Sequence, residues 1–125
     1  MKIAYAFRRE SWYPHFGPRG TELMPAELRS PWLRKVNSLG FDGLEISAAL
    51  PDGGDVSENT VGELRRQLEG SGLPVLGVRG GGGLIHPRTV DAARSRWEQA
   101  IQFAAWVGSP TLNGNLCIGS PQDQP

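Results

Sequence analysis

Glu45 is the side chain whose surroundings say most about chemistry. It stands between two apolar residues in a short segment, 43–47, that we expect to be a buried strand. A buried carboxylate must be paired or hydrogen-bonded. Two roles are therefore open. The carboxylate faces a substrate or a metal ion, or it is a structural group bonded to an arginine such as Arg8 or Arg79.

The two histidines, His15 and His86, give weaker signals. A metal site needs several converging ligands, so a lone histidine does not predict one. We expect His86, which precedes a proline, to pack on the surface or within a loop. His15 lies with Trp12 in an aromatic run, 12–16. That run predicts either a hydrophobic lid or one wall of a binding pocket.

Four consecutive glycines, Gly80 to Gly83, follow a predicted strand. Backbone N–H groups of such a run can cradle a phosphate. The run lacks the Lys-Ser/Thr pair of a P-loop and does not open directly onto a helix. A mobile loop at the rim of a site is therefore the favoured interpretation.

The elements that would position these residues follow from the spacing of apolar side chains. Short apolar segments predict strands at 2–7, 43–47, 73–79 and 111–116. Helical periodicity predicts three helices between them. The first begins at Ser30 and Pro31, with Leu28 as an upstream extension, and ends at Gly40.

Ser57 is the predicted N-cap of the second helix, which ends near Gly70 or Gly72. Thr89 is the predicted cap of the third helix, which ends at Gly108. The third helix should turn one face inward, made of Ala93, Trp97, Ala100, Ile101, Ala104 and Val107. Strict alternation of strands and helices predicts an α/β domain of parallel strands joined by right-handed crossovers. We see no internal domain boundary.

Several segments fall in the order of a known family. They are Leu39 to Ile46 (LGFDGLEI), Leu64 to Leu68 with Gly72 to Val75, and Ala100 to Ala104 with Val107 to Leu112. The chain resembles the xylose isomerase-like TIM-barrel superfamily over about residues 1–112. Residues 113–125 form a tail that follows the part of the chain in which we see the resemblance.

The resemblance implies a (β/α)₈ TIM barrel, which needs about 250 residues. We therefore expect residues 1–125 to be the N-terminal half, a partial barrel of four parallel strands and three crossover helices. Relatives typically use a divalent metal (Mn, Mg, Co or Zn) to isomerise or epimerise sugars or sugar phosphates by proton transfer next to a carbonyl. Their ligands lie mainly on the last four strands, so we predict no metal ligand and no tight metal binding here. We expect this fragment to be inactive alone.

Barrel active sites form at the carboxyl ends of the strands. With the resemblance, this rule predicts a substrate-binding set made of Trp12, His15, Glu45, Arg79, His86 and Asn113. Asn115 and Arg8 lie at the same kind of position. Asn113 falls where relatives often carry a histidine, which leaves the role of that position open. The expected partner is a small sugar or sugar phosphate.

Composition bears on the alternatives. Thirteen basic and thirteen acidic residues give zero net charge, which disfavours nucleic acid and anionic membranes as partners. One cysteine and no long apolar run suit a cytoplasmic protein. Two alternatives stay open: a metal-dependent nuclease of the endonuclease IV type, and a non-catalytic half-barrel or flavodoxin-like binding domain. A half-barrel would have open strand edges, which favour self-association.

Overall fold

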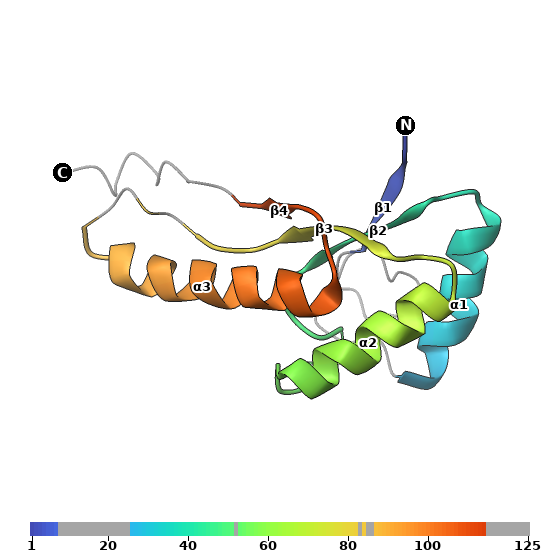
Figure 1. Cartoon of the computed structure of the whole chain (residues 1–125), viewed down its shortest axis with the longest axis horizontal. Helices are drawn as coiled ribbons and strands as arrows, with labels where there is room; N and C mark the ends of the chain where they lie inside the picture. The colour runs from blue at the N-terminus through green and yellow to red at the C-terminus, as the bar shows by residue number, and fades with distance from the viewer. Residues whose placement is uncertain (8–25, 52, 83, 85–86, 115–125) are drawn as a thin grey trace, which may run out of the picture.

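The computed structural model describes residues 1–7, 26–51, 53–82, 84 and 87–114. Strands and helices alternate throughout this part of the chain (Figure 1). The strands are β1 (Ala4–Phe7), β2 (Gly43–Ser47), β3 (Val75–Arg79) and β4 (Leu112–Asn113). The helices are α1 (Ala26–Ser38), α2 (Glu58–Gly70) and α3 (Val90–Val107). The βαβ alternation predicted from the sequence is confirmed.

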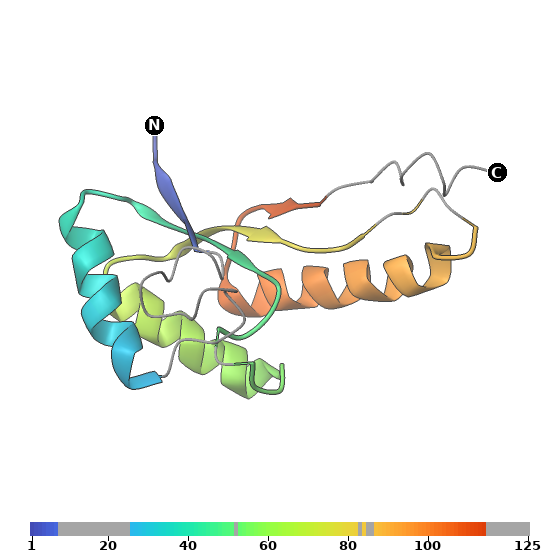
Figure 2. The same ribbon diagram turned by 180° about the vertical axis from the view of Figure 1, so that it is seen from behind.

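The four strands form one parallel sheet in the order β1-β2-β3-β4. Each helix links two neighbouring strands, and all three helices lie on the same side of the sheet in both views (Figures 1 and 2). A doubly wound sheet, by contrast, carries helices on both faces. Consecutive strand order with one-sided helices is the arrangement found in half of a TIM barrel, which confirms the predicted fold class.

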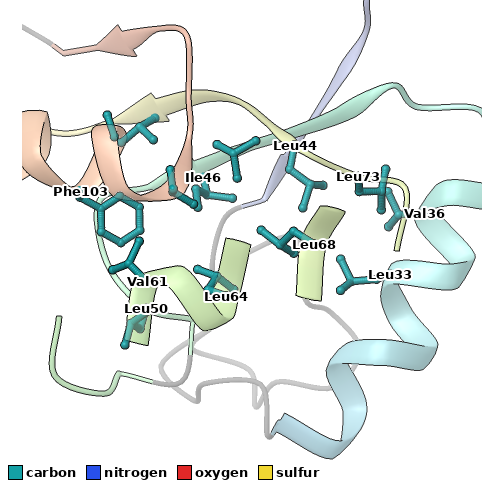
Figure 3. Close-up of a cluster of buried hydrophobic side chains, with 14 residues drawn as sticks. Leu33, Val36, Leu44, Ile46, Leu50, Val61, Leu64, Leu68, Leu73 and Phe103 are labelled. Carbon is teal, nitrogen blue, oxygen red and sulfur yellow. The ribbon is translucent and has the colours of Figure 1, made fainter. Parts of the chain in front are cut away.

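One apolar core fills the space between the sheet and the helices (Figure 3). Leu44 and Ile46 contribute the helix-facing side of β2, and α2 contributes a row of leucines and valine. Because side chains alternate along a strand, Glu45 and Ser47 lie on the opposite face, which no described helix covers. The core therefore fixes which residues β2 presents to the uncovered face.

Helix α1 begins earlier than predicted. It starts at Ala26, so Pro31 lies inside the helix and Ser30 is not its cap. Pro31 has no N–H to donate to the carbonyl of Glu27, four residues back. The first turn is fixed instead through Arg29, which is buried and donates to the Gln67 side chain of α2 at 3.0 Å. This tertiary contact outweighs the local signal for a start at Ser30.

The other helix ends largely follow the sequence. Gly40 follows the last turn of α1. Its φ of 87° lies in the left-handed range that glycine accepts. Ser57 caps α2 through a complete capping box with Thr60. Thr89 occupies the predicted cap position of α3, but its side chain makes no cap hydrogen bond.

The predicted inward face of α3 is wrong at one position. Ile101 is 57% exposed, and Phe103 is fully buried in its place. Phe103 lies three residues after Ala100 and four before Val107, both of which are buried, so helical spacing puts it on their face. Ile101 is rotated by about 100° around the helix axis from Ala100, which turns its side chain away from the core. None of the helices in the described residues is long and apolar enough to cross a membrane.

Candidate functional site

Three polar residues end three neighbouring strands at the same level. Ser47 pairs in register with Arg79, and Arg79 pairs in register with Asn113. Since the strands are parallel, all three residues lie at the carboxyl edge of the sheet. Ser47 and Asn113 are exposed, and Arg79 is partly buried. This carboxyl edge is where barrel enzymes bind their substrates.

Glu45 and Arg79 form an ion pair across β2 and β3. The Nε atom of Arg79 lies 2.8 Å from Oε1 of Glu45, and the two side chains are 32% and 26% exposed. The buried Nε–H is not aligned with the carboxylate oxygen, so the contact is an ion pair without a straight hydrogen bond. A second guanidinium nitrogen of Arg79 donates to the Ser47 hydroxyl at 3.4 Å. Arg79 is thus held by two residues of β2.

A register shift between β2 and β3 brings these groups to the same face. Leu44 pairs with Val75, whereas Glu45 pairs with Gly77, so Leu76 is an extra residue in β3. A side chain on Gly77 would begin 3.6 Å from Cγ of Glu45 and 3.8 Å from Nδ2 of Asn113. The same Cβ would lie 3.2 Å from Oγ1 of Thr111, so Gly77, which is buried, lets these three side chains lie close to its backbone.

A shallow groove of about 420 Å³ lies at the carboxyl edge. Its lining combines polar side chains with glycine backbone from the loops after β3 and β4: Ser47, Arg79, Gly80, Gly81, Gly82, Asn113 and Gly114. The charged lining residue, Arg79, is already paired with Glu45. Hydroxyl, amide, guanidinium and peptide groups in one groove suit a small ligand rich in hydroxyl groups.

The glycines after β3 are packed against helix α3. The Gly80 N–H donates to the carbonyl of Asn113 at 3.0 Å, and the indole N–H of Trp97 donates to the carbonyl of Gly82 at 2.8 Å. The sequence favoured a mobile rim loop. In the structure the Gly80 N–H has a partner in β4 and the Gly82 carbonyl has one in α3, while Gly83 lies outside the described residues, and the mobility of the loop stays a prediction.

The structure brings together three of the residues singled out in the sequence: Glu45, Arg79 and Asn113. The other candidate side chains lie outside the described residues, namely Arg8, Trp12, His15, His86 and Asn115.

Sequence reasoning missed Ser47 and the part played by Trp97. Ser47 could have been found, because it lies two residues after Glu45 on the same face of a strand. The sequence pattern placed Trp97 on the core face of α3. The only signal for its contact with the loop after β3 was the run of glycines in that loop, which leaves room for a large side chain.

The described residues do not fit a metal ion. Among them, no three His, Cys, Asp or Glu side chains lie close enough together to share one. The carboxylate at the carboxyl edge, that of Glu45, is engaged by Arg79. The groups that these residues place at the carboxyl edge are hydrogen-bond donors and acceptors.

Comparison with known proteins identifies the family. The family model described as "Xylose isomerase-like TIM barrel" matches residues 33–125, more than half of the chain. That family covers isomerases, epimerases and endonuclease IV-like members. Neither the curated proteins nor the solved structures give a significant match. The one-sided parallel sheet agrees with the family match, and the chain belongs to the xylose isomerase-like TIM-barrel family.

Proposed function

We propose that this chain forms the β1–β4 wall of a barrel that isomerises or epimerises a sugar or sugar phosphate, and that the groove at its carboxyl edge binds the substrate. The observation that carries the proposal is the meeting of Glu45, Arg79, Ser47 and Asn113 at the carboxyl ends of adjacent strands. Family membership supports the fold position of the groove but leaves the reaction open among several classes.

Each residue has a binding role in this proposal. Asn113 offers both a donor and an acceptor to a sugar hydroxyl, and Ser47 offers a hydroxyl. Arg79 presents N–H groups to a sugar oxygen or a phosphate, and Glu45 orients the guanidinium. Proton transfer next to a carbonyl needs a base and a group that stabilises the enediolate. We assign neither role to these four residues, because the Glu45 carboxylate is held by Arg79.

Ligand binding by the whole chain tests the proposal. We would titrate D-xylose, D-fructose and D-fructose 6-phosphate, and follow amide shifts by NMR. The expected result is shifts centred on Ser47, Arg79 and Asn113. The substitution Asn113→Ala should raise the Kd for the sugar about fivefold, since it removes one or two hydrogen bonds.

The matched control is Asn59→Ala, an exposed asparagine at the start of α2 on the outer side of the molecule. It should leave sugar affinity unchanged. Equal effects of the two substitutions, or sugar-induced shifts away from the carboxyl edge, would refute the proposed site. Binding of duplex DNA that weakens steeply with salt would favour the nuclease branch of the family instead.

A further inference from the structure

Trp97, on helix α3, contacts the backbone of two different loops of the groove. Its indole N–H donates to the carbonyl of Gly82, in the loop after β3. Its six-membered ring lies against Gly114, which directly follows β4. Trp97 is half-buried and does not line the groove itself. It therefore supports the groove from behind.

The glycines at these contacts leave no room for any side chain. A Cβ atom on Gly81 would lie 2.2 Å from the Trp97 ring, and one on Gly114 would also lie 2.2 Å from it. Gly81 further has a φ of 83°, which other residues rarely adopt. The backbone of both loops is thus pressed onto one indole, in a way that only glycine permits.

We propose that Trp97 is a positioning residue for ligand binding: it sets the distance between the Gly80–Gly82 loop and the Asn113–Gly114 segment, and so the width of the groove. This inference rests on the proposed sugar site. The Gly80 N–H to Asn113 carbonyl bond links the two segments directly at one level. Trp97 links them a second time, farther from the strands, through the Gly82 carbonyl and the Gly114 backbone.

With the Gly80–Asn113 hydrogen bond alone, the two segments could rotate about that bond. The second link, through Trp97, restricts this rotation. The Gly82 carbonyl is also turned toward α3 by its bond to the indole. Two consequences follow for a ligand. The peptide groups that face it are held in place before it binds, and the Asn113 side chain keeps a fixed distance from the Arg79 guanidinium. Such preorganisation lowers the entropy lost on binding.

The test compares Trp97→Phe with Trp106→Phe, the same substitution on the same helix. Trp106 lies on the outer side between α2 and α3, away from both loops. Phenylalanine keeps an aromatic ring at this position, so the variant should fold, but it lacks both the N–H that donates to Gly82 and the outer carbons of the six-membered ring that lie against Gly114. Loss of one hydrogen bond should raise the Kd for the tightest sugar of the panel about fivefold in Trp97→Phe only.

Amide hydrogen exchange without ligand supplies a second measurement. Exchange of the Gly80 amide, which donates to the carbonyl of Asn113, should accelerate about fivefold in Trp97→Phe and stay unchanged in Trp106→Phe. Faster exchange with unaltered sugar affinity would reduce Trp97 to a structural role and overturn the inference. Equal exchange in the two variants would overturn it as well.

The proposed sugar site and the proposed role of Trp97 can be refuted independently of each other. If the wild-type chain binds none of the three sugars, the proposed function is refuted. Selective acceleration of exchange in Trp97→Phe would still support its hold on the two loops. If the sugars bind and both variants match the wild type in affinity and exchange, the site stands and the role of Trp97 falls.

Discussion

At the scale of single residues, the pairing of Glu45 with Arg79 determines the electrostatics of the groove. Each side chain is about a quarter to a third exposed, so solvent screens the pair only in part. The pair places no net charge at the groove. The proposed ligand would therefore meet directed hydrogen bonds from these residues rather than a net charge.

The stability of the pair can be measured with Glu45→Gln. This substitution leaves the partly buried Arg79 guanidinium without its counter-charge, and we expect a loss of about 1 kcal/mol of unfolding free energy in urea. Glu69→Gln serves as the control, because the Arg65–Glu69 pair on α2 is nearly half exposed. It should cost about 0.3 kcal/mol. Equal losses would mean that the Glu45 pair is worth no more than a surface pair.

The sequence predicted part of this site for a clear reason. A carboxylate between two core residues of a strand requires a partner, and Arg79 ends the neighbouring strand. Asn113 followed from the same rule, since it ends the next strand, and only the level at which Ser47, Arg79 and Asn113 meet had to come from the strand pairing. The contacts of Trp97 depend on how α3 crosses the β3 loop, which side-chain periodicity does not encode.

At the scale of elements, helix α1 tolerates a proline in its second turn. Pro31 is exposed, yet its ring removes a backbone hydrogen bond within the helix. Arg29 and Leu33 on either side of it are buried. The contacts of these neighbours with the rest of the core keep the helix intact through this position.

Replacing Pro31 with alanine should therefore stabilise the protein. Alanine restores the N–H and has the highest helix propensity, so we expect a gain of about 1 kcal/mol, less than the full difference in propensity because proline also restricts the unfolded chain. Arg34→Ala, at another exposed position of α1, should change stability by less than about 0.5 kcal/mol. A lower melting temperature for Pro31→Ala would contradict this account.

Element order and most boundaries were predictable because local signals agree with the tertiary structure. The capping box at Ser57 and the glycine at position 40 are examples. The prediction was wrong where a distant contact outweighed a local signal. Ser30-Pro31 has the composition of a helix start, but the bond between Arg29 and Gln67 extends the helix upstream.

At the scale of the whole molecule, the sheet is covered on one face only by described helices. In the described residues, β1 and β4 each pair with a single strand, so each has an open edge. Such edges can pair with the edge of another chain. The uncovered face carries Glu45, Ser47 and Arg79, and is polar where a sandwich of two sheets would be apolar.

We expect the 125-residue chain to self-associate through these edges. The weight-average sedimentation coefficient should rise with protein concentration. Ala4→Lys places a charge on exposed β1 and should reduce the rise, because an edge lysine opposes strand pairing. Asn59→Lys adds the same charge at an exposed position of α2, outside the sheet, and should leave the rise unchanged. A monomer at all concentrations, with a sharp two-state unfolding transition, would contradict the prediction.

The extra residue Leu76 has a consequence for anyone who exchanges segments between family members. Downstream of it, residues of β3 face the side opposite to the one that a continuous count from Val75 would give. A donor segment of equal length that pairs without this bulge would direct its counterpart of Arg79 into the apolar layer beneath the sheet. Chimeras should therefore be joined after Gly77, where the two-residue repeat of β3 is already in phase with Glu45.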